Sequence, residues 1–266
     1  MTTREVAAAL LGGIVAGFAG GLFGVGGGIV LVPLLTVVLH LSQHQAHGTS
    51  LAAIGATAVA SLVVYGLHAD VAWGTAALVG VASLLTARYG ARLAARTSPR
   101  NLRRIFAVFL LLVALRLLWR APAAAGPPFH GLLQAVGFDL ALGAAVGLLA
   151  GLMGVGGGIL AVPAFTLVLG MSQPTAQGTS LAVILVTAPA GAIEHHRHGN
   201  VALRLVPWLA LGAALGGPAA SWLAVGLPQA ALARAFAAFL LANAVHLWVR
   251  SGPRGAAHQN GSGEAD

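Results

Sequence analysis

Residues 21–29 read Gly-Leu-Phe-Gly-Val-Gly-Gly-Gly-Ile, and residues 151–159 read Gly-Leu-Met-Gly-Val-Gly-Gly-Gly-Ile. The two stretches differ at one position and begin 130 residues apart, since 151 minus 21 is 130. The same offset relates Gly48-Thr49-Ser50-Leu51-Ala52 to Gly178-Thr179-Ser180-Leu181-Ala182. From position 21 to 54, 22 of 34 residues recur in the second copy, so the chain is an internal duplication.

The composition indicates whether this chain folds in water or in a membrane. Of 266 residues, 58% are hydrophobic and 8% are charged, whereas a soluble domain carries about 25% charged residues. The chain is therefore predicted to be a polytopic membrane protein, with the lipid bilayer as its partner. Cysteine is absent, which excludes disulfides and thiol chemistry. The net charge of +8 is explained by membrane topology, so no nucleic-acid partner is expected.

The apolar stretches within each copy are unequal in length. A spanning helix needs about 20 residues, and the last three stretches of the first copy qualify. The first two are short, and the glycine-rich run between them cannot continue a helix cheaply. Because irregular backbone at membrane depth must be buried or line a cavity, we interpret each opening pair as a broken or re-entrant hairpin. The five stretches of the first copy are 6–22, 29–41, 46–67, 72–94 and 103–120.

These observations predict an all-α membrane protein of two homologous repeats, each with four to five helical segments. Its predicted parts are a first repeat (1–120), a linker (121–131), a second repeat (132–250) and a disordered cytoplasmic tail (251–266).

Arginine residues indicate the orientation of the repeats, because cytoplasmic loops are enriched in positive charge. Six Arg residues fall between 88 and 104, whereas the equivalent segment 217–230 has no charge. Arg197 and Arg204 flank a loop whose first-copy equivalent contains Asp70. The bias changes sides between copies, which predicts inverted repeats with both termini in the cytoplasm. Arg116 and Arg120 lie on the opposite side in this scheme.

The glycine-rich motif has two interpretations that the residues leave open. No Gly-Lys-Ser/Thr follows it, so it is not a nucleotide-binding loop. It is either a tight turn or, because Pro33 marks the start of a following helix, a nest of backbone N–H groups that binds an anion. The upstream Gly13, Gly17 and Gly21 are predicted to serve close helix packing. The candidate binding residues of this motif are Gly24, Gly26, Gly27, Gly28, Gly154, Gly156, Gly157 and Gly158.

The second motif precedes an apolar run, where Ser and Thr are typical N-caps of a helix. It either caps alone or adds hydroxyl donors to a second pair of helix starts, which would place four helix starts around one central point. Its candidate binding residues are Gly48, Thr49, Ser50, Gly178, Thr179 and Ser180, and His47 and Gln177 are candidate pathway-lining residues.

Other titratable residues receive a weaker interpretation. The repeat does not preserve His40, His44 and His47, so neither a metal nor another cofactor is predicted. The run Glu194–His198 reads as a solvated cluster, with a proton-sensitive gate as the alternative. Asp139 lies either near membrane depth, where acids are functional candidates, or at the interface. Ser50 and Ser180 have no repeated His or Asp partner, so an enzyme is not expected.

Gly-Val-Gly-Gly-Gly-Ile-x-x-Val-Pro followed by Gly-Thr-Ser-Leu-Ala, both present twice, resembles the TauE/SafE family of sulfite-exporter-like membrane proteins. The resemblance extends from about Val6 to Val249 and implies an inner-membrane carrier of small sulfur-containing anions. It places the functional positions at Gly24–Gly28 with Pro33, at Gly48–Ser50, and at their twins.

The predicted function is transport of a small anion, sulfite or a related organosulfur anion, by alternating access at a midplane site between the repeats. A passive channel for small solutes is the alternative from another class. The substrate, proton coupling and oligomeric state stay open at this point.

Overall fold

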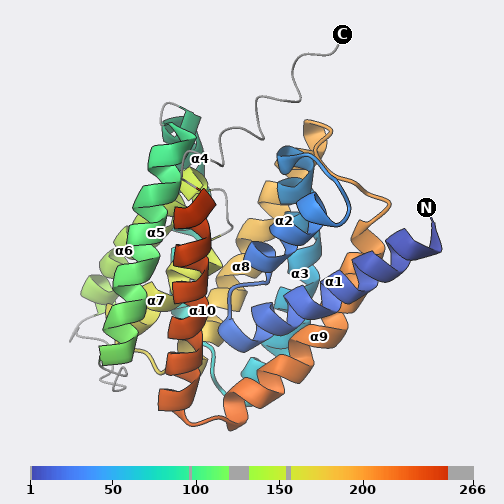
Figure 1. Ribbon diagram of the computed structural model, residues 1–266. Helices are drawn as coiled ribbons and strands as arrows, with labels where there is room; N and C mark the ends of the chain where they lie inside the picture. The colour runs from blue at the N-terminus through green and yellow to red at the C-terminus, as the bar shows by residue number, and fades with distance from the viewer. Residues whose placement is uncertain (1, 96–97, 120–131, 154–156, 251–266) are drawn as a thin grey trace.

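The computed structural model describes residues 2–95, 98–119, 132–153 and 157–250, and this part of the chain is almost entirely helical (Figure 1). The first five helices are α1 (Thr3–Phe23), α2 (Gly28–Val37), α3 (Gln43–Leu67), α4 (Trp73–Ala95) and α5 (Pro99–Trp119). The other five are α6 (Leu132–Met153), α7 (Gly158–Leu167), α8 (Gln173–Arg197), α9 (Val206–Gly226) and α10 (Gln229–Arg250). The predicted all-α fold is confirmed. The predicted linker and tail lie outside the described residues.

Helices of the two halves correspond in order and length. The short helices α2 and α7 have ten residues each and follow the glycine-rich motifs, and α3 and α8 have 25 residues each. Of the described helices, six are long and apolar enough to cross a membrane, namely α1, α3, α6, α8, α9 and α10. The chain is therefore a multi-pass membrane protein.

The predicted spans need correction at three helices. The first helix was expected to be short, but α1 has 21 residues and is one of the six candidate spans. A capping box starts it early, because the Thr2 hydroxyl accepts from Glu5 N while the Glu5 carboxylate accepts from Thr2 N. Conversely, α4 and α5 were predicted to span and are not among the six. Helix α4 carries two Arg residues and α5 carries four, which lower their mean hydropathy.

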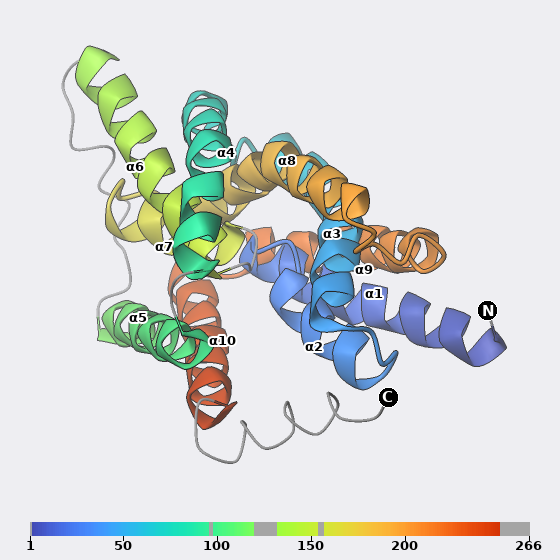
Figure 2. The ribbon, with the colours of Figure 1, turned by 90° about the horizontal axis from the view of Figure 1, so that it is seen from above.

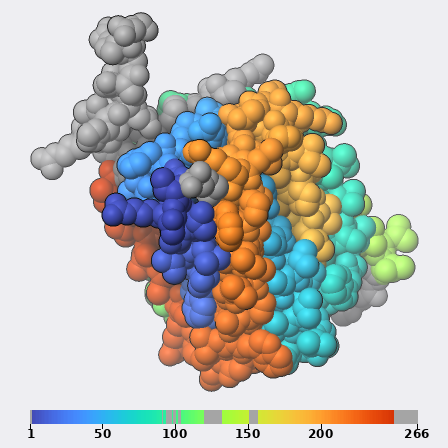
Figure 3. Space-filling view, turned by 90° about the vertical axis from the view of Figure 1, so that its right-hand side faces the viewer, coloured from blue at the N-terminus to red at the C-terminus, as the bar shows by residue number. Residues whose placement is uncertain are grey.

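Each half packs mainly against the other half. Figure 2 shows α1 beside α9, α4 beside α6, and α5 beside α10, and each of these pairs joins a helix before residue 120 to one after residue 131. The α1–α9 pair is visible on the surface in Figure 3. Small residues allow this approach: a methyl group added to Gly17 would lie 2.5 Å from the Ala213 carbonyl oxygen. One added to Gly147 would collide with Ser83 and Thr86. The predicted packing role of the upstream glycines is thus observed.

The equivalent helices α3 and α8 cross the centre in opposite directions. Gly48, near the start of α3, lies against the Asn200 carbonyl group just beyond the end of α8. Gly178, near the start of α8, lies against the Asp70 carbonyl group just beyond the end of α3. In both places the start of one helix lies against the segment that follows the end of the other, so α3 and α8 are antiparallel. The orientation of each half in the membrane stays a prediction.

Candidate functional site

The first glycine-rich loop connects α1 to α2 through backbone that favours glycine. Gly24 ends α1 with φ +69°, and Gly26 and Gly27 have φ +73° and +87°. Residues with a β-carbon rarely adopt such angles. Gly27 is also the N-cap of α2, and no side chain caps that end of the helix. Every residue from Gly24 to Gly28 is buried, so an uncapped helix start lies inside the protein.

Neighbouring helices leave this loop no room for side chains. A methyl group on Gly24 would lie 2.5 Å from the Gln177 α-carbon, and one on Gly27 would collide with the Ala16 carbonyl oxygen. Around Gly26, the nearest side chains are Ile54 and Ile184, which occupy equivalent positions in α3 and α8. The loop is therefore held between α1, α3 and α8.

The second glycine-rich loop reaches the same place from the other half of the chain. Gly154 and Gly156 lie outside the described residues. Gly157 is the N-cap of α7, again without a side-chain cap, and both Gly157 and Gly158 are buried. A methyl group on Gly158 would lie 2.9 Å from the Val25 α-carbon, so the two loops touch. The structure thus brings the described residues of the first motif, Gly24–Gly28 with Gly157 and Gly158, together at the centre.

The predicted helix starts at Gly48 and Gly178 are wrong. Helix α3 begins at Gln43, and Ser42 is its N-cap, with a capping box that includes Gln45. In α8, Ser172 is the N-cap and accepts from Thr175 N. These polar residues satisfy the first N–H groups, so the helix has already formed when the Gly-Thr-Ser motif is reached. Two helix starts meet at the centre, where four were expected.

The threonines of this motif hold loops from the opposite half. Ala202 N donates to Thr49 Oγ1 over 2.9 Å, and Ala72 N donates to Thr179 Oγ1 over 3.0 Å. Both threonines are fully buried. Residues 72 and 202 are themselves 130 apart, so the two contacts are related by the repeat. We call this pair of hydrogen bonds the threonine latches.

Ser180 contacts both glycine-rich loops directly. Its hydroxyl donates to the Gly24 carbonyl oxygen over 2.7 Å, and the Gly158 carbonyl oxygen lies 3.4 Å away. The hydroxyl hydrogen is thus occupied within the protein, which leaves Ser180 as a positioning group for the loops. Ser50, its twin, is 3% exposed.

Gln177 offers a free donor beside the first loop. Its side chain is fully buried, and Nε2 has no hydrogen-bond partner among the described residues. The Tyr65 hydroxyl lies 3.0 Å from Gln177 Oε1 and 2.9 Å from the Gly21 carbonyl oxygen. Sequence reasoning missed Tyr65 because it searched for repeated residues, and the residue equivalent to Tyr65 is His195. His47, equivalent to Gln177, is half-buried and lies 3.4 Å from Gln43 Nε2 on its own helix.

Asp70 lies two residues before Ala72, the donor of one of the threonine latches. Its carboxylate accepts from Thr175 Oγ1 over 3.3 Å, and its backbone carbonyl group lies against Gly178. Partial burial raises the pKa of Asp70 above its ordinary value, although the Thr175 hydrogen bond and the nearby His68 oppose the shift.

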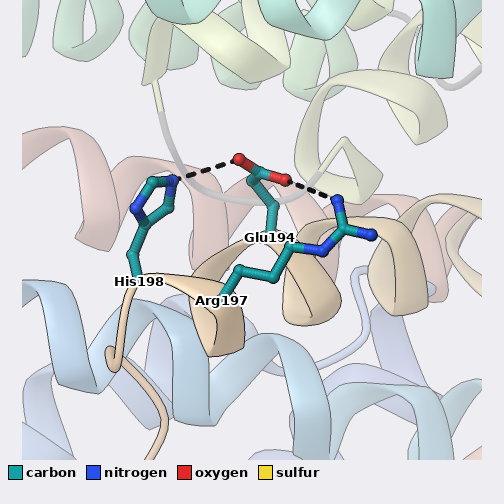
Figure 4. A network of polar contacts seen from close by, with 3 residues as sticks. All are labelled: Glu194, Arg197 and His198. Atoms are coloured by element: carbon teal, nitrogen blue, oxygen red, sulfur yellow. Dashed lines mark hydrogen bonds and ion pairs between the residues drawn. The ribbon is translucent and has the colours of Figure 1, made fainter.

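Three residues of the Glu194–His198 run form an exposed network of polar contacts (Figure 4). Glu194 Oε1 lies 3.1 Å from His198 Nε2, and Glu194 Oε2 lies 3.7 Å from Arg197 Nη1, with all three side chains more than 60% exposed. These three side chains are exposed, as the solvated interpretation expects, whereas His195 of the same run is half-buried. Asp139, by contrast, is 7% exposed and belongs to the interior.

Comparisons with known proteins agree with this architecture. The family described as "Sulfite exporter TauE/SafE" matches residues 2–117 and again residues 140–265. A "Probable membrane transporter protein YunE" of Bacillus subtilis is 32% identical over 231 residues, covering 77% of this chain and 84% of the relative. A "Probable membrane transporter protein" of Xylella fastidiosa is 28% identical over 255 residues, covering 94% and 98%. No solved structure matches the chain. The chain therefore belongs to the sulfite exporter TauE/SafE family, whose curated relatives here are named as membrane transporters.

Proposed function

We propose that this protein carries a small anion, sulfite or a related organosulfur anion, and binds it where the two glycine-rich loops meet. One observation carries the proposal: two helices, α2 and α7, begin at buried glycines without side-chain caps in loops that touch. The N-terminus of a helix presents unpaired N–H groups and a partial positive charge, which suit an oxyanion. Segments 21–54 and 151–184 contain no Arg or Lys, so backbone N–H groups supply the attraction.

The proposed binding residues take different roles in this site. Backbone N–H groups of Gly24, Gly26, Gly27 and Gly28, with their twins Gly154, Gly156, Gly157 and Gly158, contact the anion. The Gln177 amide adds a side-chain donor, because its Nε2 is buried without a partner beside Gly24. The Gly-Thr-Ser residues, Gly48, Thr49 and Ser50 with Gly178, Thr179 and Ser180, position the loops around the anion. His47 lines the pathway at the start of α3.

Access to the site alternates between two sides of the membrane as two helix groups move relative to each other. We propose that each group contains helices from both repeats, 1–120 and 132–250. The seams α1–α9 and α4–α6 are packed through glycines, and moving one whole repeat against the other would break both. The moving units are therefore an α1–α2–α9 group and an α4–α6–α7 group, with α3 and α8 between them.

In the cell, the proposed location is the inner membrane, with both termini in the cytoplasm. The inversion of the Arg bias between the repeats supports this orientation. Cysteines introduced near Arg96 and Arg197 should then be labelled from the same side of the membrane, and labelling from opposite sides would contradict it.

Counterflow in proteoliposomes tests the transport proposal. Vesicles loaded with unlabelled sulfite should accumulate labelled sulfite transiently, and uptake should saturate and be competed by organosulfonates. The Gln177→Leu variant should raise KM at least tenfold, because a buried donor is lost at little change of volume. Protein-free vesicles correct for passive permeation. Non-saturable flux without exchange would identify a passive channel, and absence of flux for every anion tested would contradict the proposal.

A further inference from the structure

A carboxyl group is buried inside one of the candidate membrane spans. Asp139 lies in α6, seven residues or about two turns from the first residue of that helix. The residue is 7% exposed, and Thr75 of α4 is its side-chain hydrogen-bond partner. Ionisable groups at such positions are expensive to bury and mark ion pathways or proton relays.

Asp139 belongs to a line of polar contacts between α4 and α6. Ser83 Oγ donates to the Gly143 carbonyl oxygen over 2.9 Å, and Thr86 Oγ1 donates to the Ala144 carbonyl oxygen over 3.0 Å. Two turns nearer the start of α4, Thr75 meets Asp139. The carbonyl acceptors keep the same charge at every pH. Asp139 is the one acceptor of these three that can gain or lose a proton.

Packing of the fold does not require this polar pair. In the repeat, Ala9 stands at the position equivalent to Asp139, and Leu205 stands at the position equivalent to Thr75. Ala9 is fully buried and Leu205 is 2% exposed, so apolar side chains occupy the equivalent positions of the α1–α9 seam. The carboxyl group therefore occurs in the α4–α6 seam and has no counterpart in the equivalent α1–α9 seam.

No cation neutralises Asp139 among the described residues, where both ion pairs involve Glu194. Helix α7 has no titratable side chain, and Asp139 is the sole one on α6. On the other elements next to α6, namely α4 with the loop before it and α5, the titratable groups whose side chains the structure describes are His68, Asp70, Arg88, Tyr89, Arg92, Arg104 and Arg116. Of these, His68 and Asp70 precede α4 and so lie at the end of that helix where Asp139 is found.

We propose that Asp139 binds and releases one proton in each transport cycle, and so couples anion movement to the proton gradient. This rests on the proposed carrier function. The proton comes from water on one side of the membrane, forms one O–H bond with the carboxylate, and returns to water on the other side. Thr75 donates its hydroxyl hydrogen to the charged carboxylate, and the neutral carboxyl group donates in its turn.

Transport driven by an imposed pH gradient tests this coupling. Wild-type protein in proteoliposomes should accumulate labelled sulfite under one sign of gradient, and a pH dye trapped inside should report proton movement when sulfite is added. Asp139→Asn should reduce gradient-driven accumulation at least tenfold and abolish the dye signal. Counterflow of sulfite, which needs no net proton movement, should stay within about twofold of wild type in this variant. Retained gradient-driven accumulation in Asp139→Asn would overturn the proposal.

Two variants of the same seam separate proton binding from a structural role. Thr75→Val removes the donor to the carboxylate, so the protonation midpoint of Asp139 should move to higher pH by about one unit. Ser83→Ala removes a hydroxyl bond of the same seam and should leave that midpoint unchanged. The midpoint is read from the infrared band of the protonated carboxyl group, which should be absent in Asp139→Asn. Equal effects of the two variants would show a structural role alone and overturn the proposal.

Failure of coupling and failure of transport give different results. Wild-type counterflow without gradient-driven accumulation would overturn proton coupling and leave the carrier function intact. Absence of both, with every anion offered, would contradict the carrier function itself and the coupling with it.

Discussion

Thr49 and Ala202 lie 153 positions apart in the chain, yet the Ala202 N–H donates to the Thr49 hydroxyl across 2.9 Å. The same relationship joins Thr179 to Ala72 across 3.0 Å. Each bond fastens the loop that follows one central helix to the start of the other central helix. The Gly-Thr motif, read from the sequence as a helix cap, therefore connects the two halves of the chain.

Replacing Thr49 by Val should lower the free energy of unfolding by about 1–2 kcal/mol, because the Ala202 N–H loses its acceptor in a buried place. Thr179→Val should cost a similar amount, while Thr49→Ser, which keeps the hydroxyl, should cost less. Unfolding in detergent with rising denaturant measures these differences. If Thr49→Val raises the KM for sulfite and leaves stability unchanged, the hydroxyl binds substrate and is not a latch.

Gly48 permits the close approach that the latch needs. Gly48→Ala should destabilise the protein by about 3 kcal/mol or more, because the new methyl group would collide with the Asn200 carbonyl oxygen. Gly55→Ala is the matched control on the same helix, since no atom lies within 4 Å of its added methyl group. The control should stabilise by about 0.5 kcal/mol through helix propensity. Thermal unfolding of both variants in one detergent compares them, and equal midpoints would contradict the observed packing.

The two glycine N-caps should respond differently to alanine. Gly27 has φ +87° and lies against Ala16, whereas Gly157 has φ −35° and would keep its methyl group 3.7 Å from the nearest atoms. Gly27→Ala should therefore fail to accumulate as folded protein. Gly157→Ala should fold and keep transport within a few fold of wild type, because its backbone N–H is unchanged. Size-exclusion profiles and counterflow measure both results, and a well-folded Gly27→Ala would show that the loop can relax.

Tyr65→Phe should lower stability by about 1 kcal/mol, since its hydroxyl contacts the Gly21 carbonyl oxygen and Gln177 Oε1 in the protein interior. With its side chain released, Gln177 should also hold the anion less well, and the KM should rise severalfold. Saturation curves for labelled sulfite give this value. An unchanged KM with reduced stability would limit Tyr65 to packing.

Asp70 should make stability depend on pH. Burial raises its pKa in the folded state, so the folded protein binds more protons than the unfolded protein between the ordinary and the raised value. Its contribution to stability is therefore full at low pH and is lost as pH rises through that window, from about pH 4 upward. Asp70→Asn should flatten this slope in thermal midpoints taken at successive pH values. A wild-type slope that survives in the variant would assign the dependence to another group.

The sequence predicted the features that depend on local pattern. Apolar stretches at 46–67 and 72–94 correspond to α3 and α4, and the glycine run at 24–28 interrupts a helical pair as expected. The start of α3 was misplaced because the rule looked for Ser or Thr next to the apolar run. Ser42 and Gln45 start the helix earlier, in a polar first turn.

Partners across the molecule could not be predicted. The glycine ridge of α1 shows that some helix approaches closely, but any small-residue face would serve as its partner, so α9 was not foreseen. Tyr65 was missed for a related reason, because the repeat replaces it with His195 and a search for repeated residues discards such a position. Gln177 was predicted as a pathway-lining residue, but the sequence does not show that its amide nitrogen is buried without a partner.

The exchange of helices between the halves also has a consequence for biosynthesis. Helix α1 ends at Phe23, and its partner α9 begins at Val206, so the 182 residues from 24 to 205 must be translated between them. At roughly 5–20 residues per second, this takes on the order of ten to forty seconds. During that interval the glycine face of α1 is in contact with lipid or with the insertion machinery, because its native neighbour does not yet exist. Assembly of this protein is thus completed only near the end of translation, and a nascent chain cut before α9 leaves the first helix without the partner that covers its Gly13 and Gly17 face.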